Sequence, residues 1–379
     1  MKEIVSFLQE KQSEMVDKLK QLVEMESPSN DKELVDKIGE KIADLFESYT
    51  GGKITVIPNN HFGNHLRGEW GEGEDGQILL LAHMDTVWPK DILQTLPFRI
   101  EGDKAYGPGA FDMKGGIVQG IFALHALKEL NISPKRKIIF LFTSDEEIGS
   151  GTSRQLIEEE AKKSSAVFVL ESAASKEGAL KTARKGVGIF NLKVKGIAAH
   201  SGIEPEKGIS AISELASQIT YLDSLSDYSK GTTLNVGVIK GGSSSNVVAA
   251  EAMAEVDLRV TANKEFDRVI PLIQDLQSTI EGTKIMVEGG INRPPFERSQ
   301  EVEELYLLAK NIAKEYLSFD LMEQLSGGGS DGNFASQYAP TLDGLGPVGD
   351  GAHANHEHAI ISQLPVRSAL LALLIKELG

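Results

Sequence analysis

The sequence contains no cysteine. This absence excludes disulfide bonds and thiolate metal ligands, so any metal ion in this protein must be held by His, Asp or Glu. The sequence also lacks an apolar run of transmembrane length, and residues 1–17 are polar and amphipathic, unlike a signal peptide. We therefore expect a cytoplasmic protein that has no membrane partner.

Basic residues are scarce as well, with 39 Lys and Arg against 55 Asp and Glu and a formal net charge of -16. This balance argues against nucleic acids and anionic membranes as partners, because both repel an acidic surface. The remaining composition, with 41% hydrophobic and 25% charged residues, is typical of a globular protein. A length of 379 residues exceeds one ordinary core and predicts two domains.

Two patterns of hydrophobic residues divide the chain. In the first, short apolar runs alternate with helical stripes, which is typical of a largely parallel sheet covered by helices on both faces. This pattern predicts strands at 53–57, 65–68, 77–82, 137–142 and 166–170, and helices at 2–25, 34–46, 114–130, 152–162, 300–317 and from 364. From about Gly186 the order becomes β-α-β-β-α-β, the split arrangement of a small two-layer domain. We therefore predict a first domain formed by residues 1–183 and 294–379, interrupted by an inserted domain at 184–293.

The apolar run Leu79–Ala82 ends abruptly in His83-Met84-Asp85. A short apolar run of this kind predicts a buried strand, and open α/β sheets bind ligands at the carboxyl ends of their strands. If His83 binds a metal ion, Asp85 is suited to accept the other imidazole N–H group, because ligating histidines commonly donate that group to a carboxylate. A lone histidine after a strand is more often not a ligand, so the prediction depends on further ligands elsewhere.

Four other segments supply candidate ligands, each with an ordinary alternative. Asp112 precedes the Gly115-Gly116 pair that opens a helix, where it could act as a helix cap. Glu146 and Glu147 follow the predicted strand 137–142, where an exposed acidic loop is the alternative. Glu171 follows the strand 166–170, where the alternative is a solvent-exposed residue at the end of the strand. His353 lies in the histidine-rich segment 349–358, which could be a solvated loop.

Together these candidates favour a metal site over the separate alternatives. Each follows a predicted strand of the same sheet, so all of them can meet at one edge. Two histidines and three carboxylate ligands, with two further carboxylates nearby, suit two zinc-like ions that share one carboxylate and a water molecule. Histidine and carboxylate sites also accept cobalt or manganese.

The motifs, in their order along the chain, resemble those of a dinuclear zinc family. This family contains glutamate carboxypeptidase, acetylornithine deacetylase, succinyl-diaminopimelate desuccinylase, aminoacylase and the di- and tripeptidases. The tracts Leu-Ala-His-Met-Asp-Thr-Val-Trp-Pro and Tyr-Gly-Pro-Gly lean towards the glutamate carboxypeptidase branch. The matching motifs are His83-x-Asp85, Gly-x-Asp112-Met-Lys-Gly-Gly, Asp145-Glu146-Glu147-x-Gly, Glu171 and Gly-x-x-His353-x-x-x-Glu357.

The resemblance implies a zinc-peptidase-like α/β catalytic domain with an inserted ferredoxin-like domain that serves as lid and dimerisation domain. It also implies the ligand set of two zinc ions per chain. One ion would be bound by His83 and Glu171, the other by Glu147 and His353, and Asp112 would bridge both.

The family's other roles fall on neighbouring residues. Asp85 would orient His83, and Glu146 would be the general base that takes a proton from the attacking water and passes it to the leaving amine. His353 matches the family's ligand because it lies four residues before Glu357, with His356 as the fallback. The family also has a cis peptide after its bridging aspartate, which predicts one at Asp112–Met113.

The inserted domain carries three further matches. Ala199-His200-Ser201-Gly202 resembles the family's lid histidine, which polarises the scissile carbonyl, usually from the partner subunit of a homodimer. Asn246 and Arg259 resemble its substrate-binding residues, and Gly328 lies in a turn that would line the substrate pocket. An arginine suits a bidentate grip on a carboxylate, although a surface ion pair is the ordinary role of an arginine in a strand.

These matches predict a metallopeptidase that hydrolyses an amide bond next to a free carboxylate, most simply a glutamate-type carboxypeptidase acting on small peptides. The nearest alternative is an N-acyl amino acid deacylase of the acetylornithine or succinyl-diaminopimelate type. A non-catalytic binding protein on this fold is disfavoured because the base, Glu146, is present. A remote alternative is a serine hydrolase, since residues 328–332 fit G-x-S-x-G around Ser330.

A metallopeptidase and a serine hydrolase respond differently to inhibitors. We expect a metal chelator to abolish hydrolysis and added Zn²⁺ to restore it, because the predicted base, Glu146, needs a water molecule that the metal ions have made acidic. A serine-directed phosphonate should leave the rate unchanged. Rates measured after each treatment decide between them, and inhibition by the phosphonate alone would contradict the metal site.

Overall fold

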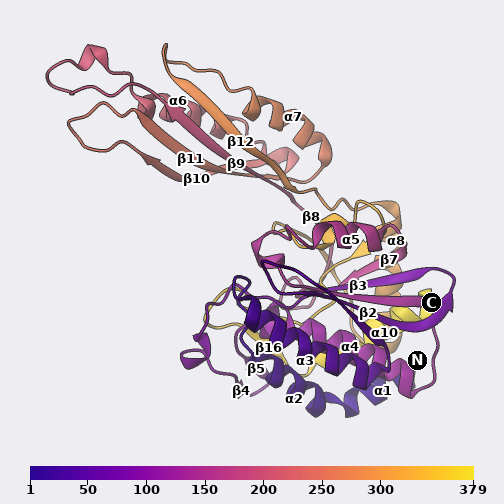
Figure 1. The fold of residues 1–379 in the computed structure, drawn as a ribbon. Helices are drawn as coiled ribbons and strands as arrows, with labels where there is room; N and C mark the ends of the chain where they lie inside the picture. The colour runs from indigo at the N-terminus through magenta and orange to yellow at the C-terminus, as the bar shows by residue number, and fades with distance from the viewer. The chain divides into compact units, whose positions relative to one another are not determined.

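The structure, a computed structural model, describes residues 1–379 (Figure 1). It divides into two compact units. Unit 1 comprises residues 1–182, 298–326 and 330–379, and unit 2 comprises residues 183–297 and 327–329. The insertion expected at 184–293 therefore falls within unit 2.

Unit 1 is built on a six-stranded sheet with the strand order β1-β2-β6-β3-β7-β14. Strands β6, β3, β7 and β14 run parallel, whereas β1 and β2 are antiparallel to their neighbours. This is the mixed, largely parallel sheet that the sequence predicts. The strands are β1 (Lys53–Ile57), β2 (His65–Glu74), β3 (Gln77–His83), β6 (Arg136–Thr143), β7 (Ser164–Val169) and β14 (Thr341–Leu342).

Helices cover both faces of this sheet, with α1 to α4 and α10 on one face and α5 on the other (Figure 1), and α8 packs against α10 and the edge strand β14. Every residue of β3 is buried, as expected for a central strand covered on both faces. No helix in the protein combines the length and the apolar character needed to cross a membrane. The helices of unit 1 are α1 (Lys2–Glu10), α2 (Gln12–Val23), α3 (Lys32–Thr50), α4 (Gly115–Glu129), α5 (Arg154–Ala161), α8 (Gln300–Ile312), α9 (Gly332–Ala335) and α10 (Gln363–Leu378).

The two faces of the sheet have separate cores. On one, the ring of Phe46 from α3 packs edge-on against Phe140 and Phe142 of β6, with ring centroids 6.4 and 6.2 Å apart. On the other, Leu79 and Leu81 of β3 pack with Ile157 of α5 and Phe334 of α9. Helix and sheet are therefore held together by apolar burial on both sides, which fixes the positions of the strand ends.

Short antiparallel strands that the sequence pattern did not predict complete unit 1. One small sheet has the order β15-β16-β5-β4, and β8 pairs with β13. These strands are only two to five residues long and lack a clear alternation, so their pairing depends on tertiary contacts. They are β4 (Arg99–Glu101), β5 (Lys104–Tyr106), β8 (Leu180–Arg184), β13 (Glu323–Ser326), β15 (Gly349–Asp350) and β16 (His358–Ile360).

Unit 2 is a four-stranded antiparallel sheet, ordered β10-β11-β9-β12, with two helices packed against it. Along the chain its elements read β-α-β-β-α-β, which confirms the predicted ferredoxin-like arrangement. Alternate residues of β9 and β11 are buried, because helices cover only one face of the sheet. Its elements are β9 (Gly186–Lys195), α6 (Ala211–Ser224), β10 (Thr233–Gly241), β11 (Glu251–Val260), α7 (Asn263–Gln274) and β12 (Lys284–Arg293).

A buried carboxylate, that of Glu214 in α6, fastens the segment between α7 and β12. Its oxygens accept the backbone N–H groups of Thr279, at 3.0 Å, and Ile280, at 2.6 Å, and a hydrogen bond from the Thr283 hydroxyl. Burial acts to raise the pKa of Glu214, but these hydrogen bonds and one from Gln218 lower it overall. The ionised form is therefore the one that stabilises unit 2.

Replacing the Glu214 carboxylate tests whether its ionised form stabilises unit 2. We expect Glu214→Gln to lower the free energy of unfolding by about 2–3 kcal/mol at pH 7, because the new amide N–H faces other donors. The difference between variant and wild type should shrink as the pH falls below about 4.3, where the unfolded carboxylate takes up its proton first. Urea unfolding at pH 7 and pH 3.5 measures both effects.

Glu288 provides the control, since its surface pair with Lys193 on the neighbouring strand is exposed. Glu288→Gln should change the unfolding curve little at either pH. A Glu214→Gln penalty that is equal at both pH values would contradict a role for the ionised carboxylate.

Candidate metal centre

The candidate site lies where three neighbouring parallel strands end. His83 is the last residue of β3 and pairs in register with Thr143, the last residue of β6. On the other side of β3, the segment after β7 leads directly to Glu171, and the Leu170 N–H group bonds to the Leu81 carbonyl at 2.9 Å. The carboxyl ends of these parallel strands thus bring His83, Glu147 and Glu171 to one edge of the sheet. Asp112 and His353 instead follow β5 and β15 of the small antiparallel sheet, so the prediction that every ligand follows a strand of one sheet is wrong for these two.

Asp85 fixes the orientation of the His83 ring. The Nδ1 atom lies 2.9 Å from the main-chain oxygen of Asp85 and 3.5 Å from its Oδ1 atom. Since a carbonyl oxygen can only accept, Nδ1 carries the proton and the lone pair of Nε2 points away from Asp85. His83 is almost fully buried, so its ring is held in the tautomer that a metal ligand needs.

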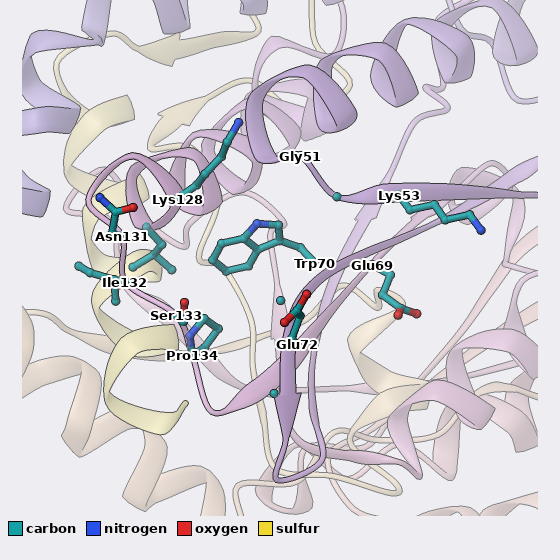
Figure 2. Close-up of a pocket in the computed structure, with 14 residues that line it drawn as sticks. Gly51, Lys53, Glu69, Trp70, Glu72, Lys128, Asn131, Ile132, Ser133 and Pro134 are labelled. Carbon is teal, nitrogen blue, oxygen red and sulfur yellow. The ribbon is translucent and has the colours of Figure 1, made fainter.

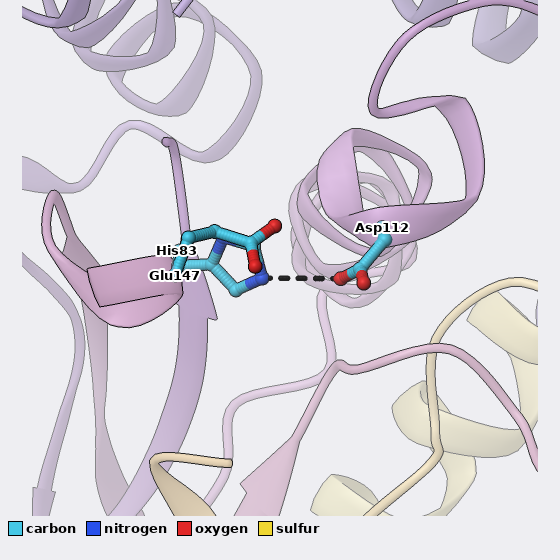
Figure 3. Close-up of side chains that lie close together, drawn as sticks. All are labelled: His83, Asp112 and Glu147. Carbon is cyan, nitrogen blue, oxygen red and sulfur yellow. Dashed lines mark hydrogen bonds and ion pairs between the residues drawn. The ribbon is translucent and has the colours of Figure 1, made fainter. Parts of the chain in front are cut away.

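Asp112 lies between two histidines and faces each with a different oxygen. Its Oδ1 atom is 3.2 Å from His83 Nε2, the pair that a dashed line joins in Figure 3, and its Oδ2 atom is 3.3 Å from His353 Nε2. Glu171 Oε1 lies 3.5 Å from His83 Nε2, and Glu147 Oε2 lies 3.2 Å from His353 Nε2. Each histidine therefore faces one oxygen of Asp112 and one of a second carboxylate.

These distances fit metal coordination. Two ligands about 2.0–2.1 Å from one tetrahedral zinc ion lie about 3.3 Å apart, which agrees with all four nitrogen–oxygen distances. The ligand atoms of His83, Asp112 and Glu147 lie within 4.8 Å of one another, as do those of His83, Glu146 and Glu171. The Oε1 atom of Glu147 is buried without a hydrogen-bond partner, which is costly for a carboxylate that has no cation beside it.

The crowding of acidic groups also shifts their pKa values. Burial raises the pKa of Glu147 to about 7. Hydrogen bonds with Asp112 and Glu147 raise the pKa of His353 to about 10, and His353 and His83 lower the pKa of Asp112 although its burial opposes this. The cluster therefore holds positive charge between its carboxylates, and a divalent ion would take the place of those protons.

The backbone around Asp112 is adapted to this position. Asp112 does not cap α4, whose N-cap is Lys114, so the alternative of a helix cap is wrong. The peptide bond Asp112–Met113 is cis, which confirms the prediction. A Cβ atom on Gly116 would lie 2.0 Å from the Leu170 carbonyl oxygen, so only glycine lets the start of α4 approach the end of β7.

Asp85 also holds the loop that carries the two glutamates. Its carboxylate accepts the backbone N–H groups of Glu146, at 3.3 Å, and Glu147, at 3.2 Å, and the Ser29 hydroxyl at 2.7 Å. Asp145, the first acid of that loop, instead accepts the backbone and hydroxyl groups of Thr152. One buried aspartate thus orients His83 and positions Glu146 and Glu147.

With this geometry established, comparisons with known proteins assign the family. The sequence profile of peptidase family M20/M25/M40 matches residues 79–377. The chain belongs to that family. Carboxypeptidase G2 from Pseudomonas sp. strain RS-16 is 32% identical over 380 residues, covering 98% of this M20 peptidase and 90% of the relative.

Two solved structures share the fold of this M20 peptidase. Aminopeptidase PepT from Bacillus cereus superimposes with a TM-score of 0.81 at 24% identity, over 97% of this chain and 98% of that one. The Bacillus subtilis YXEP protein, a dinuclear metal binding peptidase, superimposes with a TM-score of 0.71 at 18% identity, over 97% and 98% of the two chains. The predicted family and fold are confirmed.

In unit 2 of this M20 peptidase, two of the predicted residues lie on neighbouring loops. His200 forms a β-bridge with Val247, and the Ser201 N–H group donates to the Asn246 carbonyl oxygen at 3.0 Å. Arg259 lies on β11, where its guanidinium group grips both carboxylate oxygens of Asp257, at 2.7 and 2.8 Å. The ion pair that is usual for an arginine in a strand is therefore present at Arg259.

Hydrogen bonds hold the glycine-rich turn and the serine that follows it. The Arg184 side chain donates to the carbonyl oxygens of Gly328, at 3.0 Å, and Gly329, at 3.3 Å. Ser330 is fully buried and donates its hydroxyl hydrogen bond to Asp343 at 2.7 Å. A nucleophile must reach its substrate, so this burial argues against a serine hydrolase.

A hollow of about 650 Å³ lies elsewhere on unit 1, between the second half of β2 and the C-terminal ends of α3 and α4. Figure 2 shows the Trp70 indole in its middle, with Ile132 and Pro134 beside it. Its lining contains none of the candidate ligands, so the hollow is separate from the metal centre.

Sequence reasoning missed several residues that support the centre. Arg367 is buried in α10 and donates to the main-chain oxygens of Gly178, Gly344 and Gly346, and the Gly346 N–H group in turn bonds the Glu171 carbonyl at 2.9 Å. An arginine among apolar residues of a helix was the available signal. Ser29 gave no such signal, because its segment resembles an ordinary helix break.

Proposed function

We propose that this M20 peptidase is a metal-dependent hydrolase that cleaves an amide bond next to a free carboxylate, as a glutamate-type carboxypeptidase does. The observation that carries the proposal is Asp112, whose two oxygens face the Nε2 atoms of His83 and His353 at ligand spacing. The similarity to carboxypeptidase G2 along nearly the whole chain supports the choice of substrate class.

Five residues would hold two metal ions. His83 and Glu171 would bind one ion, Glu147 and His353 the other, and Asp112 both. Zinc suits this donor set, and cobalt or manganese would fit it as well. Ions bound there would polarise the scissile carbonyl and make a water molecule acidic enough to attack it.

Glu146 would move the proton. One of its carboxylate oxygens lies within 4.8 Å of the ligand atoms of His83 and Glu171, and its backbone N–H group donates to Asp85 Oδ1 at 3.3 Å. The carboxylate would take a proton from the attacking water and donate it to the amine as the C–N bond breaks. The hydrogen bond between the Glu146 backbone and Asp85 would keep Glu146 at this place.

Unit 2 would bind the substrate. The Gly202 N–H group donates to His200 Nδ1 at 3.1 Å, so the neutral ring carries its proton on Nε2 and presents it as a donor for a carbonyl oxygen. Arg259 would grip the substrate carboxylate with the guanidinium N–H groups that its contact with Asp257, made through Nε and Nη2, does not use. Asn246 and Gly328 would line the same substrate path.

A substrate panel tests the proposal. We expect the metal-loaded protein to hydrolyse peptides and acyl-amino acids that end in glutamate at least 10-fold faster than the same substrates with an amidated α-carboxyl group, because the ion pair with Arg259 is lost. Release of free amino acid measures the rates. Faster cleavage of acetylornithine or succinyl-diaminopimelate would indicate an N-acyl amino acid deacylase instead.

Glu146→Ala is the matched control for that panel. The variant should lose at least 100-fold in kcat on every substrate, because no other group takes the proton. Its metal content, measured by atomic absorption, should equal that of the wild type. Retained turnover would exclude Glu146 as the base.

We also propose that the protein forms a homodimer through unit 2. Strand β10 is an edge strand of that sheet, and two apolar side chains near its end, Val238 and Ile239, are exposed. An exposed apolar edge is a ready site for strand pairing between two copies of a chain. Dimerisation would cover both side chains.

Light scattering on a sizing column tests the dimer. We expect wild-type protein to elute as a dimer and Ile239→Lys to shift towards monomer, because a charge would be buried at the edge. Val56→Lys, on the β1 edge of unit 1, is the control and should remain dimeric. A monomeric wild type at micromolar concentration would contradict the proposal.

A further inference from the structure

We propose that Glu357 is a positioning residue whose carboxylate sets the place of the bridging carboxylate, Asp112, relative to His353. This inference rests on the metal centre of the proposed function and goes beyond it, because Glu357 is not one of the ligands. Its side chain acts on the centre through the backbone that carries Asp112.

The carboxylate of Glu357 gathers the N–H groups of the loop before α4. Oε1 accepts the backbone N–H groups of Phe111 and Asp112, both at 3.0 Å, and Oε2 accepts that of Gly109 at 3.0 Å. The Trp88 indole N–H group also donates to Oε2, at 2.8 Å, so four N–H groups donate to this one carboxylate. The bond to the Asp112 N–H group holds the ligand's own backbone.

The main chain of Glu357 belongs to the loop that carries His353. The Glu357 N–H group donates to the Ala354 carbonyl at 2.9 Å, and the Glu357 carbonyl accepts the Gly107 N–H group at 3.2 Å. The next residue, His358, pairs with Tyr106 between β16 and β5. The loop with His353 and the loop with Asp112 are therefore joined through one residue, by its main chain and its side chain.

Trp88 extends this connection to a third motif. It follows His83 on the segment that leaves β3, and its indole N–H group reaches the same Oε2 atom as the Gly109 N–H group. Segments that contribute His83, Asp112 and His353 thus share a single acceptor group. A displacement of that group would change the spacing of all three.

The stability of the fold alone does not explain why an ionised carboxylate, that of Glu357, lies at this place. Glu357 is only 3% exposed and lies near the carboxylate of Asp112, so burial and like charge both oppose it. A carboxylate nevertheless has a property that no neutral side chain offers: both of its oxygens accept, so it satisfies N–H groups arriving from two directions. The geometry of the loop requires that property.

Glu357→Gln tests the inference directly. The amide keeps the size of the side chain, but its NH₂ group faces two N–H donors and pushes the loop away. We expect the metal-stripped variant to bind Co²⁺ 10- to 100-fold more weakly than the wild type in calorimetric titration. The visible absorption bands of the Co²⁺-loaded protein should also change, because the position of the bridging oxygen atoms changes.

A second variant and a control complete the test. Trp88→Phe removes one of the four donors and should weaken Co²⁺ binding in the same direction by a smaller factor. Glu214→Gln removes an equally buried acceptor of backbone N–H groups in unit 2, and it should leave the Co²⁺ affinity and spectrum unchanged. This control separates a specific effect on the centre from a general loss of stability.

Unchanged Co²⁺ affinity and spectrum in both Glu357→Gln and Trp88→Phe would overturn the inference. If Glu357→Gln does not fold, the result for Trp88→Phe decides alone. If the wild type binds no Co²⁺, the metal centre of the proposed function fails first. The titration needs no substrate, so a wrong assignment of the cleaved bond leaves its outcome unaffected.

Discussion

The carboxylate of Asp112 faces one histidine with each of its oxygens, and much of unit 1 serves to hold it there. The distances to His83 and His353, 3.2 and 3.3 Å, match those between two ligands of one tetrahedral ion. Two further carboxylates also face these histidines, Glu171 at His83 and Glu147 at His353. Such a concentration of negative charge is stable only when cations or protons separate the groups, so the need for positive charge is built into the fold.

The residues that support this arrangement are not themselves predicted metal ligands. Asp85 holds the ring of His83 and the loop of Glu146 and Glu147, Glu357 holds the loop of Asp112, and Arg367 holds the carbonyl groups beside Glu171. Each of these charged groups is buried and bonded largely to backbone atoms. A buried charge with several backbone partners defines the position of a loop more strictly than apolar packing does, because its hydrogen bonds are directional.

Long elements with a clear hydrophobic period were predictable from the sequence, and short ones were not. The predicted strand 77–82 corresponds to β3 and the helix from 364 to α10, because their burial follows their own pattern. Strands β5 and β16, of three residues each, carry no such pattern. They form because the loops of Asp112 and His353 meet, which is a contact between distant parts of the chain.

The sequence by itself determined the family and the fold class, and it predicted the types of ligand. His83, Glu147 and Glu171 follow apolar strands whose carboxyl ends meet at one edge of a parallel sheet, and the lack of cysteine leaves only histidine and carboxylate donors. Only the tertiary structure decided which oxygen of Asp112 faces which histidine, that His353 rather than His356 reaches the centre, and that Ser330 is buried. These features depend on distances between segments far apart in the chain, and no local pattern encodes such distances.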